Sequence, residues 1–412
     1  MNKPNSLKRV AMATMIGTAI EYFDNYIYTM AAVLIFNHQF FHAADPLSGQ
    51  IAALSTLALT FIARPLGAIL FGHFGDRFGR KNTFVISLLV MGVSTMVIGL
   101  LPTYDSIGIW ATLLLCLCRI GQGIGLGGEW GGAALVAIEN APEGKRGWYG
   151  TFPQLGAPLG LLLANGAFLL ITDILGSAAM TDWAWRIPFL SSSILVVIGL
   201  YVRLKLAEAP IFVTALDKPQ PKTLPMVEVI ITHFKPFFLG MLICIAGYVL
   251  FYIIIAFSQI YAKSAPSQSE AGYAMGLGFS PQIFTALLMY SAVSLAISIT
   301  ISGKCIDKIG RRIWLIWTTV AVAIFGLALP YFLENGTTVS LFWFLIIGMG
   351  LIGASLTYNI AGLFGASVAA IIALPLNANY GLKGVGIYLT LNAVLSLIGL
   401  WFITETRDRQ LL

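Results

Sequence analysis

Residues 72–81 read Gly-His-Phe-Gly-Asp-Arg-Phe-Gly-Arg-Lys, and residues 303–312 read Gly-Lys-Cys-Ile-Asp-Lys-Ile-Gly-Arg-Arg. Both stretches fit the pattern G-x-x-x-D-[RK]-x-G-R-[RK], and each lies between two long apolar runs. One such stretch alone would be compatible with an ordinary basic loop. Two stretches at matching positions indicate an internal repeat of two similar halves.

We expect both stretches to be short cytoplasmic loops that control the opening of the protein. The first glycine of each stretch would let helices approach closely, and the second would permit the turn. The aspartate would lie at a helix N-terminus or pair with an arginine. The basic residues would hold the loop at the membrane surface. The predicted gating residues are Gly72, Asp76, Arg77, Gly79, Arg80, Gly303, Asp307, Lys308, Gly310 and Arg311.

The apolar runs around the repeat place the chain among all-α membrane proteins. Of 412 residues, 58% are hydrophobic and 10% are charged, whereas a soluble domain has about a quarter charged residues. The runs are long enough to cross a bilayer as helices, and they lack the alternation of a transmembrane barrel. The predicted spans are 10–36, 50–74, 82–102, 108–138, 149–172, 185–203, 236–261, 281–303, 313–333, 340–374 and 384–404.

The net charge of +6 is explained by the membrane and requires no nucleic-acid partner. With the N-terminus inside, most of the 24 Lys and Arg residues fall in cytoplasmic segments, and only Lys263 and Lys383 fall outside. This distribution predicts a multi-pass membrane protein, and the location we expect for it is a bacterial cell inner membrane. The four Cys and four His residues show no metal-ligand spacing, and we expect neither a metal nor another cofactor.

A polar, proline-containing stretch divides the chain. We expect an N-terminal bundle of six spans over 1–203, a cytoplasmic linker over 204–235 and a C-terminal bundle over 236–412.

The paired loops resemble the signature of the major facilitator superfamily. Residues 119–132, the stretch Glu21-Tyr-Phe-Asp24 and the stretch Trp185-Arg186-Ile-Pro-Phe resemble its metabolite:proton symporter branch, which includes carriers of shikimate, ketoglutarate, and proline or betaine. The resemblance implies two pseudo-symmetric bundles, nominally of twelve spans, with a substrate site between them and a rocking mechanism.

The second half departs from this pattern in length. Residues 82–203 number 122, whereas the matching residues 313–404 number 92, so about 30 residues are missing. The interpretation is a deletion near residue 350 that removes about one span and fuses two others into the run 340–374. As a straight helix that run would be about 52 Å long, too long for a hydrocarbon core of about 30 Å. We therefore predict that it folds as a broken or re-entrant hairpin with both ends on the periplasmic side, which keeps the C-terminus cytoplasmic.

Charged residues within spans are costly and are the first functional candidates. Glu21 and Asp24 share one face of the first span with Tyr28, and Arg119, Gln122 and Glu129 form one polar stripe on the fourth. We predict a proton-coupling role for Asp24, Glu21 and Glu129, and substrate binding for Arg119 and Gln122. Further substrate-binding candidates are Tyr28, Arg64, Gln154, Tyr248, Tyr252 and Asn359. The competing interpretation is a buried ion-pair network and an aromatic core that only stabilise helix packing.

These patterns predict a secondary active transporter, a proton-coupled symporter of a small carboxylate or zwitterion. Neither an ATP-binding loop nor a catalytic constellation is found in the sequence, so we expect a carrier and not an enzyme. The expected partners are a small-molecule substrate, protons and the lipid bilayer, with the protein acting as a monomer. The alternative is a transport-inactive membrane remnant or interaction protein, because of the shortened second half; a channel is a weaker third possibility.

Overall fold

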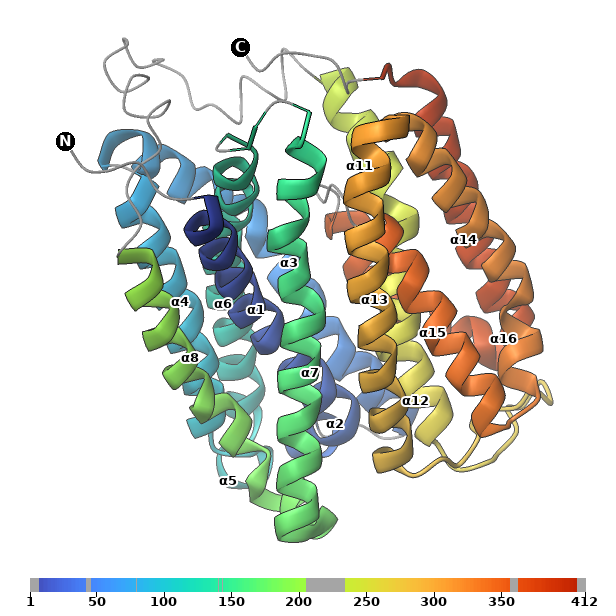
Figure 1. Ribbon diagram of the computed structural model, residues 1–412. Helices are drawn as coiled ribbons and strands as arrows, with labels where there is room; N and C mark the ends of the chain where they lie inside the picture. Colours follow the sequence, from blue (N-terminus) through green and yellow to red (C-terminus); the bar gives the residue numbers. More distant parts are fainter. Residues whose placement is uncertain are drawn as a thin grey trace. The chain divides into compact units, whose positions relative to one another are not determined.

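The computed structural model describes residues 7–41, 46–78, 80–139, 141–142, 144–204, 234–355 and 362–405. These residues are almost entirely helical, and they divide into two compact units, Met1–Phe234 and Lys235–Leu412. Each unit is a bundle of helices (Figure 1). Most of the expected linker, residues 205–233, lies outside the described residues.

The first unit contains α1 (Leu7–Ala31), η1 (Ala32–Phe36), α2 (Asn37–Gln39), α3 (Pro46–Phe78), α4 (Arg80–Leu100), α5 (Tyr104–Ile107), α6 (Ile109–Glu139), α7 (Arg146–Ala179), η2 (Met180–Ala184) and α8 (Arg186–Leu204). The second contains α11 (Phe234–Tyr252), η3 (Ile253–Phe257), α12 (Ser258–Lys263), α13 (Pro281–Ile309), α14 (Arg311–Glu334), α15 (Thr338–Ser355) and α16 (Gly362–Phe402). The elements labelled η are short π-helical turns.

Length and composition make these helices membrane spans. Eight of the described helical stretches are long and apolar enough to cross a bilayer, and two shorter apolar ones, Val85–Leu100 and Arg186–Val202, accompany them. Large apolar side chains such as Leu66, Ile174 and Trp401 remain exposed, as expected of surfaces that face lipid. The prediction of an all-α, multi-pass membrane protein is confirmed.

The internal repeat is visible in the first spans of the two units. In each unit the first long helix passes directly into a five-residue π-helical turn, η1 at Ala32–Phe36 and η3 at Ile253–Phe257. A short α-helix follows each turn, α2 in the first unit and α12 in the second. The two halves therefore repeat even an irregular feature of the backbone.

The repeated sequence stretches form less of a loop than expected. Helix α3 continues to Phe78 and α4 starts at Arg80, while α13 continues to Ile309 and α14 starts at Arg311. The prediction of loops over 72–81 and 303–312 was therefore wrong, because both stretches are mostly helical. In the second stretch the chain turns at Gly310, whose φ of 107° is a conformation that favours glycine.

Helix α15 and the first part of α16 cover most of residues 340–374, and residues 356–361 between them lie outside the described residues. Ser302 and the Trp314 indole both donate hydrogen bonds to the Ala354 carbonyl, so α15 ends beside α13 and α14, about two helical turns before α13 ends at Ile309. At the opposite end, Gly336 lies beside Leu277, and Asn377 donates to the Ala274 carbonyl. The start of α15 and the segment around Asn377 thus lie on the same side of the unit, as predicted.

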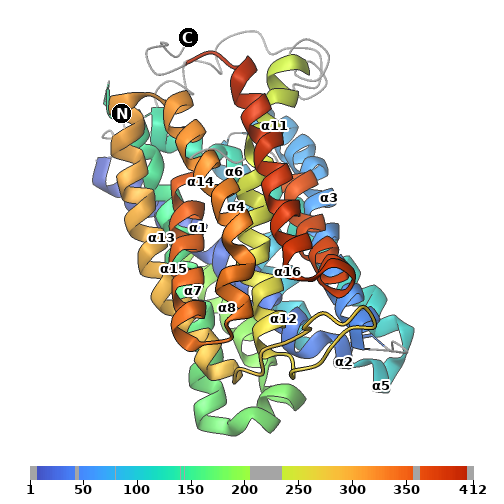
Figure 2. The ribbon, with the colours of Figure 1, turned by 90° about the vertical axis from the view of Figure 1, so that its right-hand side faces the viewer.

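The helix lengths bear on the expectation that about one span is missing. Helix α16 contains a break at Gly381, where φ is 67°, so its 41 residues form two segments. The 18 residues of α15 and the 19 residues of 362–380 are each about 28 Å long, close to the thickness of a hydrocarbon core. Figure 2 shows α15 beside α13, and α16 beside α14. Both segments therefore retain about the length of a crossing.

Candidate functional site

The interior of the first unit holds the two carboxylates of the first span. Glu21 and Asp24 are 4% and 3% exposed, on a helix that packs against α7, α8 and α6. The Asp24 carboxylate accepts one hydrogen bond per oxygen: from Thr95 on α4 to Oδ2 at 2.8 Å, and from Ser192 on α8 to Oδ1 at 2.6 Å. Among the described residues, its direct partners are therefore two neutral hydroxyls and not a cation.

Arg119 on α6 is the buried cation of the same interior, with 1% of its surface exposed. Its guanidinium carbon lies 3.6 Å from the centroid of the Tyr28 ring, so the cation stacks on the aromatic face. Its Nε donates to the Thr56 carbonyl at 3.5 Å, and its Nη1 donates to Gln122 Oε1 at 2.5 Å. The Tyr28 hydroxyl in turn hydrogen-bonds to the Thr56 hydroxyl. Tyr28, Arg119 and Gln122, three of the predicted substrate-binding residues, thus lie together in the structure.

Arg119 and Asp24 are connected through two other side chains. Gln122 accepts from Arg119 and donates from Nε2 to the Thr95 hydroxyl at 2.7 Å, and Thr95 donates to Asp24. Three helices, α1, α4 and α6, carry this connection, and α3 and α8 contribute partners at its ends. We call the complete set the polar network: Asp24, Tyr28, Thr56, Thr95, Arg119, Gln122 and Ser192.

Glycines bring the helices of the network together. A Cβ on Gly123 would lie 2.3 Å from the Thr60 carbonyl oxygen, and one on Gly127 would lie 2.0 Å from that of Arg64, both on α3. A Cβ on Gly121 or Gly125 would instead collide with α4. Residues 121–127 therefore contain two interleaved small-xxx-small patterns, one for each neighbouring helix.

The fifth span uses glycine in the same way. A Cβ on Gly156 would lie 2.6 Å from the Ala19 backbone nitrogen, and one on Gly160 would lie 2.8 Å from that of Phe23. These contacts allow α7 to pack directly on α1, beside the carboxylates. Gln154 on α7 is 8% exposed, and its Oε1 has no hydrogen-bond partner among the described residues.

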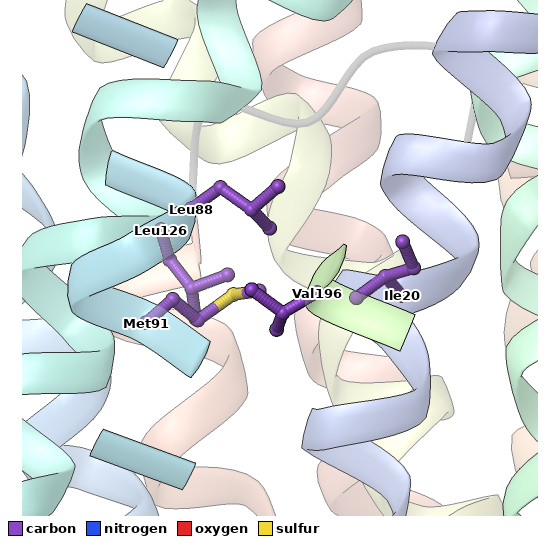
Figure 3. Packing of buried hydrophobic residues seen from close by; sticks show 5 residues of the cluster. All are labelled: Ile20, Leu88, Met91, Leu126 and Val196. Atoms are coloured by element: carbon purple, nitrogen blue, oxygen red, sulfur yellow. The ribbon is translucent and has the colours of Figure 1, made fainter. Parts of the chain in front are cut away.

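An apolar layer adjoins the polar network on one side. It consists of Ile20, Leu88, Met91, Leu126 and Val196, whose side chains point toward one another from α1, α4, α6 and α8 (Figure 3). Four members lie one helical turn from a member of the network: Ile20 from Asp24, Met91 from Thr95, Leu126 from Gln122, and Val196 from Ser192. All four steps lead toward the predicted cytoplasmic end of the unit, since α1 and α4 run opposite to α6 and α8.

The other predicted site residues are more scattered. Arg64 is half-buried, with its guanidinium carbon 4.4 Å from the centroid of the Phe61 ring. Tyr248 and Tyr252 are on α11 in the second unit, and Tyr252 packs against Phe251. Asn359 lies outside the described residues, as does the side chain of Glu129.

The predicted gating residues have mixed outcomes. A Cβ on Gly72 would meet nothing within 4 Å, so the expected close helix approach there was wrong, whereas Gly303 is buried. The N-terminus of α14 is occupied by Glu405, which accepts from the Arg311 and Arg312 backbone nitrogens at 3.1 and 2.9 Å. Asp307 lies instead in the last turn of α13. Gly79 and the side chains of Asp76, Arg77 and Arg80 are outside the described residues.

Comparison with known proteins then decides the family. The model of the family described as "Sugar (and other) transporter" matches residues 10–222, more than half of the chain. This chain belongs to the sugar transporter family of the major facilitator superfamily. A putative metabolite transport protein of Haemophilus influenzae is 83% identical over 100% of this chain and 97% of its own length. The inner membrane metabolite transport protein YhjE of Escherichia coli is 44% identical over 99% of this chain and 96% of its own length.

More distant members of the transporter family have named substrates. The shikimate transporter of E. coli is 32% identical over 82% of this chain and 74% of its own length, and the proline/betaine transporter of E. coli is 33% identical over 79% and 64%. A solved structure of the proton:xylose symporter XylE has a TM-score of 0.68 at 16% identity, covering 97% of this chain and 96% of that one, which shows the shared fold. The sugar transporter family member described here is therefore a multi-pass membrane transporter of the bacterial inner membrane.

The Haemophilus relative is also longer than this chain within the aligned region. Its alignment extends over 433 positions, 21 more than the 412 residues of this chain. The relative therefore has at least 21 residues that this chain lacks.

Proposed function

We propose that the protein is a proton-coupled symporter of a small metabolite that carries a carboxylate. The observation that carries this proposal is the pairing of one buried carboxylate, Asp24, with one buried guanidinium, Arg119, through two hydrogen-bonding side chains. In this proposal Asp24 is the group that takes up the proton, and Arg119 binds the anionic group of the substrate. Glu21, buried one turn earlier, and Glu129 are secondary candidates for the proton.

Electrostatics explains how the two events would be coupled. An ionised Asp24 lowers the positive potential around Arg119, and so it competes with an anionic substrate for the same cation. A protonated Asp24 no longer competes, so proton binding strengthens substrate binding, and by reciprocity substrate binding favours the proton. The fully loaded and the empty carrier would then be the two species that reorient, which is the requirement for symport.

The names of the relatives support an anionic recognition group. Shikimate, proline and betaine differ in shape and net charge, yet each contains a carboxylate. The planar fork of an arginine matches a carboxylate better than a lysine ammonium does. The stacked position of the Arg119 guanidinium on the Tyr28 ring fixes the plane of that fork.

The two-unit fold supports a rocking, alternating-access cycle carried out by a monomer. The alternative is a transport-inactive remnant, and the residues that the Haemophilus relative has in excess are the observation in its favour. Against it, α15 and residues 362–380 each retain about the length of a crossing. A lost loop with shortened helix ends is compatible with transport, whereas a lost crossing would invert the last span.

The decisive experiment is uptake by the purified protein in liposomes. Labelled shikimate, 2-oxoglutarate, proline and glycine betaine would be tested with and without an inward proton gradient. We expect one of them to accumulate only with the gradient, and to stop doing so when a protonophore is added. If liposomes with the protein take up no more of any compound than liposomes without it, the result would favour the inactive remnant. Accumulation that is the same with and without the gradient would exclude proton coupling.

A further inference from the structure

The hydroxyl of Thr95 occupies a junction in the polar network. Its Oγ1 lies 2.8 Å from Asp24 Oδ2, 3.1 Å from the Met91 carbonyl oxygen and 2.7 Å from Gln122 Nε2. Thr95 itself is fully buried. Three polar atoms from three helices thus surround one hydroxyl.

A proton count shows that these contacts cannot all be donated by the hydroxyl. A threonine hydroxyl has one proton to donate and two lone pairs to accept with. The Gln122 amide nitrogen can only donate, so it takes a lone pair. The single Thr95 proton must therefore choose between Asp24 Oδ2 and the Met91 carbonyl, and both acceptors are already in place.

The protonation state of Asp24 determines which of the two acceptors the Thr95 hydroxyl donates to. When the carboxylate is ionised, the charge-assisted bond to Oδ2 is preferred, and every donor from Arg119 through Gln122 and Thr95 points toward Asp24. Hydrogen bonds aligned in this way polarise one another. When Oδ2 is protonated, Asp24 becomes the donor, the Thr95 proton turns to Met91, and the aligned chain is broken.

Ser192 identifies the oxygen that receives the proton. Its hydroxyl has one acceptor among the described residues, Asp24 Oδ1, so it continues to donate there in both states. Oδ2 faces the hydroxyl that has an alternative acceptor. Asp24 can therefore be protonated on Oδ2 without its hydrogen and that of the Thr95 hydroxyl pointing at each other.

We infer that Thr95 is a positioning residue that transmits the protonation state of Asp24 to Arg119. This inference deepens the proposed function and rests on Asp24 as the proton site. Reversal of the Thr95 hydroxyl weakens the bond from Arg119 to Gln122, which leaves the guanidinium readier to donate to a substrate anion.

Few other charged or polar groups near Asp24 could transmit its protonation state to Arg119. The charged groups near it are Glu21 on its own helix and Arg119 on α6. From α4 and α8 it receives the two hydroxyls. From α7, the buried polar side chains in the described chain are neutral: Thr151, Gln154 and Asn165.

Infrared difference spectroscopy during a pH titration tests the inference without any substrate. The carboxyl band of Asp24 is assigned by its loss in Asp24→Asn, and the guanidinium band of Arg119, with isotope-labelled arginine, by its loss in Arg119→Lys. In the parent protein both bands should change at the same pH. Thr95→Val, which keeps the shape and removes the hydroxyl, should retain the Asp24 titration and lose most of the Arg119 response.

Three further variants control for structure. Thr95→Ser should restore the Arg119 response. Gln122→Leu, which removes the hydrogen-bonding side chain between Thr95 and Arg119, should abolish it. Ser192→Ala should move the titration midpoint of Asp24 while the Arg119 band still follows it. A full Arg119 response in Thr95→Val would show that the charge acts through space and would overturn the inference, as would the absence of any Asp24 titration while the protein stays folded. The proposed function fails separately, if Asp24→Asn still accumulates substrate with the gradient.

Discussion

The two units share a backbone plan and differ in what they bury. Counted back from the first residue of the π-helical turn, Asp24 in the first unit corresponds to Ile245 in the second. The first unit buries Glu21, Asp24 and Arg119, whereas the buried polar side chains described in the second unit are neutral, such as Gln259, Thr285 and Asn377. The repeat therefore accounts for the fold, while the buried charges of the proposed coupling site lie in one copy, as far as the described residues show.

The largest expected effect is the loss of coupling in Asp24→Asn. The amide keeps the size of the side chain and cannot exchange a proton, so gradient-driven accumulation should fall to equal concentrations inside and outside. Exchange of labelled for unlabelled substrate should partly survive. Both are measured in liposomes, with Asp173→Asn as the matched control, since Asp173 is exposed on α7. Normal accumulation by Asp24→Asn would show that the carboxylate buried in the first unit is not needed for coupling.

The next effect concerns the shape of the buried cation. We expect Arg119→Lys to be nearly as damaging as Arg119→Ala, because a lysine cannot keep the contacts with Gln122, Thr56 and the Tyr28 ring together. Loss of about 1.5–3 kcal/mol of charge-assisted hydrogen bonding would raise KM by about tenfold to a hundredfold. An Arg119→Lys variant with the parent KM would mean that only the positive charge matters.

A smaller effect is expected from glycine packing. Gly127→Ala should destabilise the first unit by about 1–3 kcal/mol, because its Cβ collides with backbone. Gly72→Ala on α3 is the matched control, since its Cβ meets nothing within 4 Å. Thermal unfolding in detergent measures both. Equal losses for the two variants would show that helix propensity or lipid contact, and not this crossing, sets the stability.

The smallest effect belongs to the second unit. Glu405→Gln removes a negative charge from the N-terminus of α14, which is worth about 0.3–1 kcal/mol, so Tm should fall by about 1 °C. The decrease should vanish in high salt. Glu334→Gln, at the C-terminal end of the same helix, should leave Tm unchanged or raise it slightly. A larger fall in Tm for Glu334→Gln than for Glu405→Gln would exclude the explanation by charge at the helix ends.

Much of the fold could be predicted because apolar runs and basic loops follow directly from the bilayer. The run over 340–374 was harder, since no charge or proline in it indicates where α15 ends at Ser355. Sequence length suggested a missing span because it cannot distinguish a deleted helix from two shortened ones. The capping of α14 by Glu405 was also missed, because it joins residues more than 90 positions apart.

The candidate site was predicted unevenly for a similar reason. Charged residues in a span are rare and attract attention, so Asp24 and Arg119 were found, and the spacing of Gln122 from Arg119 indicated a shared face. Thr56, Thr95 and Ser192 were not, because hydroxyls are common in membrane helices and usually bond to their own backbone, as Ser191 and Ser193 do. Only the packing of four helices shows which hydroxyls face a carboxylate.

The apolar layer beneath the network has a consequence for energy conversion. A proton bound at Asp24 has hydrocarbon side chains, Ile20 and Met91 among them, on the side toward the cell interior. A charge cannot cross such a layer without a large desolvation cost, so the layer insulates the carboxylate against a direct leak. In the proposed symport cycle, the proton therefore leaves on the opposite face, and only after the carrier has reoriented. How much of the gradient is converted into a substrate gradient, and how much is lost as heat, thus depends on residues that carry no charge.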